Sequence, residues 1–400
     1  MQKKLLTLAV AGALAAPGLA LAQVEVYGFV NMSVGKFKYS TATSGVGGSV
    51  SKWDVASHAS NYGLRARENL GGGQTAWFQI EQNAPMERNN NIAHTPASRN
   101  SAVGMQGGWG NLFIGQWTTP WADLDALWGI GTVGGWGPIT AIIGRRETTG
   151  SAPNAACVNG TSVPTAGVCD VVEGGGGVGH PFWRRISNSV FYQSPVFGGA
   201  QVKAAYQTND VKSTVPAGDA SLYSVSVTWS GMGGRLRIGG AYDGHKDFTT
   251  VGQTDKGWRV TGGWNVGFAD LGLAYEQMTY KIAAGDCEAT QYGVGLAVPV
   301  GSGFIRGSYA VADDLDGPAT CVPANPGGSA AGDNGAKQWN LGYEHRFSKR
   351  TTVGFGYAVI KNDTAATFTW TGAPPTQAGG LGPIAGSDPS TFFVNMVHRF

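Results

Sequence analysis

Residues 74–81 read Gln-Thr-Ala-Trp-Phe-Gln-Ile-Glu, and this stretch decides the fold. Side chains alternate between the two faces of a strand, so Ala76, Phe78 and Ile80 share one face, opposite a largely polar face. Residues 352–359, Thr-Val-Gly-Phe-Gly-Tyr-Ala-Val, repeat this pattern with small residues on the second face. The sequence therefore predicts an all-β protein whose sheet has one apolar and one polar or small-residue face.

The composition agrees with a β protein that is rich in glycine and aromatic residues. The chain of 400 residues has 64 glycines, and charged residues make up 14% of it. Soluble domains usually contain about 25% charged residues. The 28 basic and 26 acidic side chains are too evenly balanced for a nucleic-acid-binding surface. We therefore expect no nucleic-acid partner, and an ordinary cytosolic enzyme is disfavoured.

The N-terminal segment, residues 1–22, has the layout of a secretory signal peptide. Two lysines precede an apolar run that starts at Leu5, and residues 20–22 (Ala-Leu-Ala) form a small-x-small cleavage site. A membrane anchor helix is the alternative, but Pro17 interrupts the run. We predict an exported protein whose mature domain comprises residues 23–400.

The connections between the alternating segments switch regularly between short and long. Short turns are predicted near residues 68–73, 107–110, 196–199, 231–234, 267–270, 299–302 and 347–349. Long connections are predicted at about 41–50, 86–97, 119–183, 210–220, 243–256, 281–290, 312–337 and 362–391. Such a series joins about sixteen antiparallel strands, with both termini on the short-turn side. This is the asymmetry of a transmembrane β-barrel with short periplasmic turns and long extracellular loops, whereas a soluble sandwich or propeller predicts none.

A sheet in lipid has to close, because every backbone N–H and C=O group there needs a partner within the protein. A barrel of about sixteen strands is too wide for side chains to fill, so water occupies its lumen unless a loop or plug folds inward. The polar faces of the strands are then the inner faces. Outward aromatic side chains near strand ends, such as Tyr192 and Phe400, are expected at the membrane interfaces.

Five segments, in this order, resemble Gram-negative general porins of the betaproteobacterial type across essentially the whole mature chain. They are VEVYGFVNMSVG from residue 24, SNYGLRARENLGGGQTAWFQIE from 60, ASRNSAVGMQGGWGNLFIGQ from 97, RISNSVFYQSPVFGG from 185 and LGYEHRFSKRTTVGFGYAVIKN from 341. The final residues, FFVNMVHRF, resemble the signal that directs such barrels to assembly, with Phe400 at its end.

The resemblance implies a trimeric outer-membrane porin whose third extracellular loop, about residues 119–183, folds into the lumen. Such a protein is a passive channel for ions and small hydrophilic solutes, with no enzymatic reaction and no cofactor. It also implies contacts with outer-membrane lipid, lipopolysaccharide and the barrel-assembly machinery. Two alternatives stay open: a substrate-selective channel, in which Trp117 and the loop tryptophans offer stacking surfaces, and a barrel that sheathes a partner protein. A catalytic site is not expected, because the six histidines are scattered and no Gly-x-Ser-x-Gly elbow occurs.

Strand phase and the resemblance together give the candidate pore residues. Tyr62 and Leu64 are expected to face lipid, and Ile186 and Tyr192 likewise, which turns Arg185 inward. The predicted pore-lining and constriction residues are Asn61, Arg65, Arg67, Glu81, Arg99, Gln116, Asp123, Asp125 and Arg185. Acids of the third loop are expected to face this basic wall and create a transverse field; they are Asp123, Asp125, Glu147, Asp170 and Glu173. Asn61 and Gln116 stand where the family usually has arginine, so the predicted anion preference rests on fewer arginines than the family pattern provides.

All four cysteines are predicted to lie in long loops of an exported protein, where an oxidising compartment permits disulfides. Of the three possible pairings we favour Cys157–Cys169 within the third loop and Cys287–Cys321 between the sixth and seventh loops. The sequence has no Cys-x-x-Cys pair, and no pair of histidines lies near the cysteines, so no metal site is expected.

Overall fold

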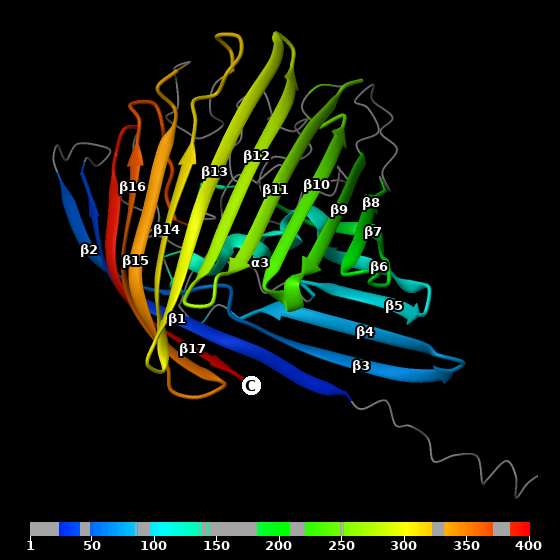
Figure 1. Ribbon diagram of the computed structural model, residues 1–400. Helices are drawn as coiled ribbons and strands as arrows, with labels where there is room; N and C mark the ends of the chain where they lie inside the picture. The colour runs from blue at the N-terminus through cyan, green and yellow to red at the C-terminus, as the bar shows by residue number, and fades with distance from the viewer. Residues whose placement is uncertain are drawn as a thin grey trace, which may run out of the picture.

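A computed structural model describes residues 24–40, 49–84, 86, 97–135, 137, 142–143, 182–208, 221–248, 250, 252–321, 332–370 and 385–400. These residues form one antiparallel sheet whose tilted strands curve into a barrel (Figure 1). The expected signal peptide at residues 1–22 and the proposed Cys157–Cys169 pair lie outside the described residues.

Strands account for most of the described chain. They are β1 (Glu25–Tyr39), β2 (Val50–Ser57), β3 (Asn61–Gly71), β4 (Gln74–Asn83), β5 (Ser101–Gly107), β6 (Gly110–Thr118), β7 (Arg185–Gln193), β8 (Ala200–Gln207), β9 (Ser221–Gly231), β10 (Leu236–Lys246), β11 (Thr254–Asn265), β12 (Asp270–Ile282), β13 (Gly285–Val300), β14 (Gly303–Ala312), β15 (Ala336–Arg346), β16 (Thr351–Asn362) and β17 (Pro389–Arg399). The helical segments are α2 (Pro120–Asp123), α3 (Asp125–Trp128), η1 (Gly129–Gly131) and η5 (Met232–Gly234). None of the helices in the described residues is long and apolar enough to span a membrane.

The barrel closes through β1. One edge of β1 pairs with β17, from Phe29 opposite Arg399 to Tyr39 opposite Pro389. The other edge pairs with β2 through residues 32–39 and with β3 through residues 25–29. β2 and β3 are therefore two parts of one wall strand, interrupted at residues 58–60. The seventeen segments of the described chain thus build a closed wall of sixteen strands, which confirms the predicted architecture.

The predicted short turns are all present, each between two consecutive strands from β3–β4 to β15–β16. The first of them shows why glycine is needed, because Gly71, Gly72 and Gly73 have φ angles of 81°, 58° and 76°. Glycine adopts this left-handed region without a steric penalty. The start of β1 and the C-terminus lie at the same end of the barrel as these turns (Figure 1). This end is the periplasmic one.

One predicted long connection is wrong. Residues 281–290 mostly belong to β12 and β13, which leave only Ala283 and Ala284 between them. An ion pair of 2.5 Å between Lys281 and Asp286 joins the two strands near the tip, and a disulfide ties Cys287 of β13 to Cys321 beyond β14. The disulfide confirms one predicted pairing. Cys287, which was expected in a loop, lies in β13.

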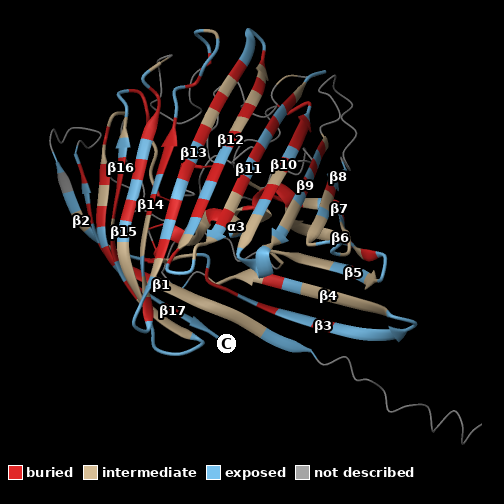
Figure 2. Cartoon of the chain, viewed as in Figure 1, coloured by how far each residue is buried: buried red, intermediate tan, exposed pale blue. Residues whose placement is uncertain are grey.

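The two faces of the wall follow the predicted alternation. On β17, Phe392, Val394 and Met396 are exposed, whereas Phe393 and Asn395 between them are buried. Buried and exposed residues alternate in the same way along many of the strands (Figure 2). The exposed apolar side chains form the outer, lipid-facing surface, and the inner face carries the polar residues.

The first part of the third loop lies inside the barrel, as predicted. α2, α3 and η1 contact the inner side of the wall from β8 to β14, and α3 is visible within the ring of strands in Figure 1. Trp121 and Trp128 are fully buried there. Trp136 and the acids Glu147, Asp170 and Glu173 lie outside the described residues.

Glycines on the inner face make room for this loop. A Cβ atom at Gly263 would overlap the carbonyl oxygen of Leu127, and one at Gly272 would overlap that of Trp128. A Cβ atom at the loop residue Gly131 would overlap the carbonyl oxygen of Gly307, and the backbone nitrogen of Gly131 lies 3.0 Å from the position of a Cβ at Gly295. We call Gly263, Gly272 and Gly295 the glycine wall. Backbone packs directly on backbone here, so a side chain at Gly263 or Gly272 would displace the loop.

Candidate functional site

Asp125, at the start of α3, fixes the loop to the wall. Its carboxylate is 2.8 Å from Nη2 of Arg259 on β11. The guanidinium is fully buried, donates to the backbone oxygen of Trp121 at 3.0 Å, and lies 3.4 Å from the carboxylate of Glu276 on β12. The indole Nε1 of Trp183 donates to the other oxygen of Asp125. One carboxylate therefore joins the beginning of the loop, its end and the barrel wall.

Asp123, at the end of α2, is bound to a different part of the wall. One oxygen forms an ion pair of 2.7 Å with Lys203 on β8, and the other accepts a hydrogen bond of 3.0 Å from Thr118. The backbone N–H of Thr118 donates to the side-chain oxygen of Asn100, which also accepts a 2.7 Å hydrogen bond from Nε of Arg185. This network of hydrogen bonds links Asp123 to Arg185. The structure places both loop acids on wall cations, Lys203 and Arg259, that the sequence did not single out.

Glu81 and Arg99 form an ion pair on the wall near the start of the third loop. Arg99 Nε lies 2.6 Å from Glu81 Oε1, and both side chains are 12% exposed. Tyr27 of β1 donates to the other oxygen of Glu81 at 2.9 Å, and Arg99 donates to Asn83 at 3.1 Å. Glu81 lies in register with Gly63 of β3. The predicted residues Glu81 and Arg99 are therefore adjacent, and the acid neutralises the base.

Arg65 and Arg67 follow on the same side of β3, closer to the periplasmic turns. Arg65 makes two hydrogen bonds, of 2.9 and 2.7 Å, with the carboxylate of Glu25. Its guanidinium also lies 4.8 Å from the ring centre of Tyr27. The ion pair is solvated, with exposures of 45% and 56%, so it contributes little to stability. Arg67 is exposed and lies in register with Trp77 of β4.

Asn61 is buried where β3 begins, and its amide donates to the carbonyl oxygen of Ala59 at 3.1 Å. Ala59 has a φ of 53° at the interruption between β2 and β3. Asn61 therefore stabilises this break in the wall strand.

Arg185 is buried, but the alternation used to orient it is wrong in one place. Ile186, expected to face lipid, is fully buried in a cluster with Phe113 and Phe191. The reason is an irregularity of the strand: Asn188 has a φ of 50°, which interrupts the pleat between Ile186 and the exposed Val190. Two-residue periodicity cannot be carried across such a residue.

Gln116 lies at a second irregularity, where the register of β6 shifts between Gly115 and Trp117. Gln116 pairs with Ser101 of β5, and two residues along the strands Ile114 pairs with Val103. Val103 and Ile114 are both exposed, and the alternation of the strand puts Gln116 on their face. Its amide donates to the carbonyl oxygen of Arg99 at 3.3 Å. The structure therefore does not bring Gln116 onto the face that carries Phe113 and Trp117.

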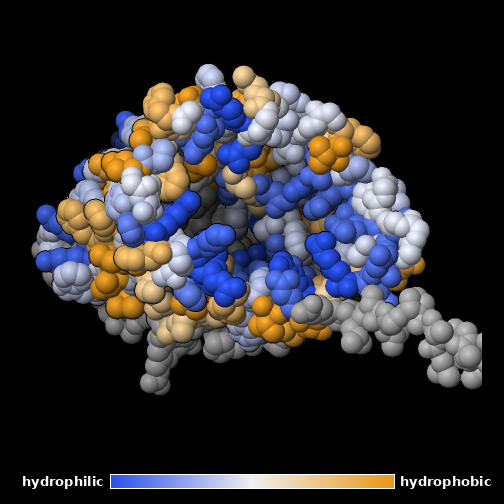
Figure 3. Space-filling model, turned by 60° about the horizontal axis from the view of Figure 1, so that its bottom comes forward, coloured by the Kyte–Doolittle hydropathy of each residue, from blue (hydrophilic) through white to orange (hydrophobic). Residues whose placement is uncertain are grey.

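An aromatic cluster occupies the same inner wall. The Trp77 and Phe113 rings lie 5.3 Å apart, Phe113 and Trp117 5.2 Å, and Phe113 and Phe191 4.8 Å. These distances are typical of packed aromatic pairs. We call Trp77, Phe113, Trp117 and Phe191 the inner aromatic cluster. Seen from the periplasmic end, the molecule is hollowed, and hydrophilic residues surround the opening (Figure 3).

A closed barrel, an inner loop and a polar hollow are the parts of a diffusion channel, and the comparison with known proteins agrees. Residues 7–365 match the family model described as Gram-negative porin. The chain belongs to the Gram-negative porin family. Outer membrane porin protein 32 of Delftia acidovorans is 28% identical over an alignment of 426 positions, gaps included, that covers 100% of both chains. Major outer membrane protein P.IB of Neisseria meningitidis serogroup A is 25% identical over 361 residues, 88% of this porin and 91% of the relative.

Solved structures show the same fold. The anion-selective porin from Comamonas acidovorans superposes with a TM-score of 0.68 and 24% identity, covering 95% of this porin and 100% of that chain. OmpT of Vibrio cholerae gives a TM-score of 0.58 with 15% identity over 94% and 97% of the two chains. The porin is thus an outer-membrane channel for passive diffusion, and its family is one of channels rather than enzymes.

Sequence reasoning missed three wall residues of this porin, namely Lys203, Arg259 and Glu276. A signal for Arg259 was present, because it lies between Trp258 and Val260, which are both exposed on the outer face. Alternation alone would have turned Arg259 inward. No comparable signal linked it to Asp125, which lies 134 residues earlier in the chain.

Proposed function

We propose that this porin is a homotrimeric channel that passes small hydrophilic anions in preference to cations. One observation carries the proposal: the acids at the described part of the constriction are bound to cations. Asp123 is paired with Lys203, Asp125 with Arg259 and Glu81 with Arg99. Arg67 and Arg185 add positive charge to the same inner wall, and Arg185 is held by the neutral amide of Asn100.

Charged side chains set ion preference in a pore because they act at close quarters on ions that have shed part of their hydration. Each of these acids is offset by a paired cation, so Arg67 and Arg185 add positive charge to the described inner wall. The similarity to a porin whose title describes it as anion-selective supports the same sign of preference here. We assign Arg65, Arg67, Arg99 and Arg185 to the lining of the passage, with Glu81, Asp123 and Asp125 as the acids that position them or the loop.

Several properties follow from family membership. We propose that residues 1–22 are removed as a signal peptide, that residues 23–400 form the barrel, and that Cys157 and Cys169 form a second disulfide. The assembly machinery would recognise the C-terminal strand, where Phe400 is exposed and its backbone N–H is 3.1 Å from the oxygen of Gly28. Contacts with lipid and lipopolysaccharide would form on the outer apolar surface.

Two other functions would place different demands on the lumen. A barrel that sheathes a partner protein needs a clear lumen, and the third loop packed on the glycine wall argues against it. A substrate-selective channel is favoured by one observation, the inner aromatic cluster, in which Trp77 and Trp117 are partly exposed. Such a channel would show conductance that saturates with solute concentration, whereas a general pore would not.

The test is the zero-current potential of the purified porin in a planar bilayer across a KCl gradient. We expect an anion preference that falls when Arg65, Arg67 and Arg185 are replaced together by Gln. Arg235→Gln is the control, because Arg235 is exposed at the β9–β10 turn and donates only at the rim, to the carbonyl oxygen of Asn265. A cation preference, or a potential that the triple variant leaves unchanged, would contradict the proposal. Conductance steps in groups of three would support the trimer.

A further inference from the structure

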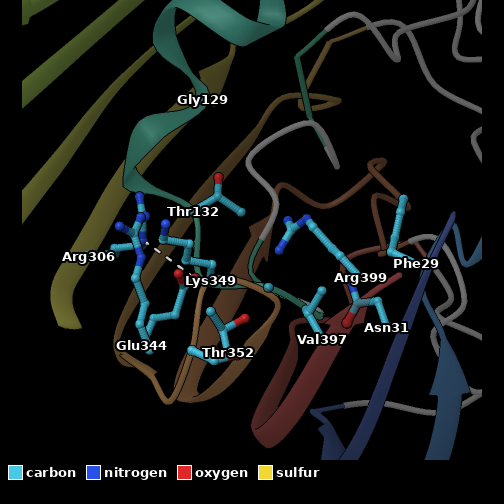
Figure 4. A pocket seen from close by; sticks show the side chains of 13 residues that line it. Phe29, Asn31, Gly129, Thr132, Arg306, Glu344, Lys349, Thr352, Val397 and Arg399 are labelled. Carbon is cyan, nitrogen blue, oxygen red and sulfur yellow. Dashed lines mark ion pairs between the residues drawn. The ribbon is translucent and has the colours of Figure 1, made fainter. Parts of the chain in front are cut away.

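A cavity of about 890 Å³ lies beneath the third loop, at the periplasmic end of the barrel (Figure 4). Its roof is the loop backbone at Gly129, Thr132 and Gly134, and its walls come from β1 and β14–β17. None of the residues predicted at the constriction is among the described residues that line this cavity.

The charges that line this cavity are mostly positive. Among the described lining residues the cations are Arg306, Arg346, Lys349 and Arg399, and the acid is Glu344. Glu344 Oε2 lies 3.6 Å from Arg306 Nε, so the single carboxylate is already associated with one guanidinium. The lining thus carries a large excess of positive charge within one cavity.

Two of these cations are held in place by their surroundings. Arg306 lies 5.0 Å from the ring centre of Phe304, and Arg346 lies 4.5 Å from the same ring. Arg306 Nη1 also donates to the carbonyl oxygen of Ile130 in η1, which couples it to the third loop. Arginines stacked on a ring keep their remaining N–H groups available and correctly oriented for an oxyanion.

The other two cations come from the ends of the last strands. Lys349 lies in the β15–β16 turn, which is stabilised because Ser348 Oγ accepts the backbone N–H groups of Arg350 and Thr351 at 3.1 and 3.0 Å. Figure 4 shows Lys349 beside Arg306, and Arg399 extending into the cavity from β17. The cations therefore surround the space from different sides.

We propose that this cavity is a second anion subsite, which binds a small oxyanion carrying several negative charges, such as a tricarboxylate or a diphosphate. The inference rests on the proposed anion-conducting function and names the solute class for which this side of the loop is suited. A monovalent anion compensates only part of the excess charge, whereas a multivalent one engages several guanidinium groups and the ammonium at once. The subsite would retain such anions just after they pass the constriction, or just before they enter from the periplasm.

Isothermal titration of the folded, detergent-solubilised porin with citrate and with pyrophosphate tests the subsite independently of conduction. Acetate at matched ionic strength serves as the monovalent reference. We expect binding of citrate or pyrophosphate that weakens roughly tenfold in Lys349→Gln and in Arg399→Gln, as for the loss of one charge-assisted hydrogen bond. Arg350→Gln is the matched control, because Arg350 is exposed in the same turn but does not line the cavity.

Each outcome is decisive. Binding that is equally strong in the wild type, Lys349→Gln and Arg399→Gln overturns the subsite. Binding of acetate as strong as that of citrate, or no binding of either probe, overturns it as well.

A change of gel migration on boiling verifies that each variant is a folded barrel. Block of the KCl current by the same probes gives a second readout: it should be weaker in Lys349→Gln than in Arg350→Gln. A porin that binds citrate but carries no current would contradict the proposed channel function and leave the subsite supported.

Discussion

The inner surface of the barrel has two contrasting sides. From β11 to β13 its inward positions include the glycine wall, and the third loop lies directly on the backbone there. From β3 to β7 the inward positions carry Glu81, Arg185 and the inner aromatic cluster. The glycines let the loop backbone pack directly on β11–β13, whereas inward side chains line the wall from β3 to β7. We infer that the open passage is displaced towards β3–β7.

The same contrast holds for charge. On the loop side, Arg259 is fully buried between Asp125 and Glu276 and acts as an anchor. On the open side, Arg65 is 45% exposed and its ion pair with Glu25 is solvated. Buried ion pairs are costly to break, whereas exposed ones contribute little to stability but remain available to passing ions. The two sides thus separate Arg259, which anchors the loop, from the arginines that we propose line the passage.

Among the variants that test this contrast, Arg259→Met should change stability and conductance most. It removes the buried cation that contacts Asp125 and Glu276. We expect the free energy of unfolding to fall by about 3–5 kcal/mol, the range for removing one partner of a buried ion pair. The loop should detach and the conductance should rise. Arg259→Lys keeps the charge and should be less severe. Stability is measured as the temperature at which the band of the folded barrel disappears from a gel. An unchanged midpoint of this transition in Arg259→Met would contradict the anchor role.

Gly272→Ala should have the next largest effect, because its Cβ would overlap the carbonyl oxygen of Trp128. Overpacking of this kind typically costs about 1–3 kcal/mol. We expect a lower unfolding temperature and a raised conductance as the loop moves off the wall. Gly262→Ala is the matched control on β11, since the nearest atom to its Cβ would be 3.5 Å away, an ordinary contact. Equal behaviour of the two variants would show that the glycine wall does not seat the loop.

Glu81→Gln tests the open side and should act on selectivity rather than stability. It removes the carboxylate 2.6 Å from Arg99 and so exposes more positive charge to the passage. One unit charge at ~6 Å in water is worth about 0.7 kcal/mol, roughly a threefold change in a permeability ratio. We expect the zero-current potential to shift towards stronger anion preference. A shift in the cation direction would show that Glu81 is not part of the passage.

The smallest effect on the pore is expected when Cys287 and Cys321 are both replaced by Ser. The disulfide joins residues 34 apart near the outer end of the β12–β13 hairpin. Its loss should make this hairpin easier to cleave with protease while conductance stays unchanged. Limited proteolysis followed by mass spectrometry measures the cleavage. Altered ion selectivity in this variant would mean that the hairpin influences the passage.

Most of the fold could be predicted from the sequence because two-residue alternation and turn composition are local signals. The turn glycines 71–73 and the alternating C-terminal strand illustrate this. Alternation failed at Ile186, where a positive φ at Asn188 changes the phase. Backbone irregularities of this kind depend on tertiary packing and leave no clear trace in residue type. Gln116 was placed at the pore by its resemblance to a family position, whereas it lies in phase with the exposed Ile114.

The candidate site was less predictable than the fold. Arg99 and Glu81 were both expected at the pore, but their mutual ion pair depends on cross-strand register and not on spacing. Asp125 was expected to face the basic wall, yet it binds Arg259 because the glycine wall draws the loop to the opposite side of the barrel. The sequence contains those glycines, but among 64 of them only the structure distinguishes the ones that touch the loop.

The position of the open passage is tested most directly by thiol labelling of two inward positions. Gln79 on β4 is half-buried on the uncovered side, and Thr261 on β11 is 2% exposed beneath the loop, with its hydroxyl 3.5 Å from the carbonyl oxygen of Leu124. Gln79→Cys and Thr261→Cys are treated in the bilayer with a small, negatively charged thiol reagent, beside the wild-type porin. The account predicts that the reagent reduces the current through Gln79→Cys and leaves Thr261→Cys and the wild type unchanged. Modification of Thr261→Cys as fast as that of Gln79→Cys would contradict it.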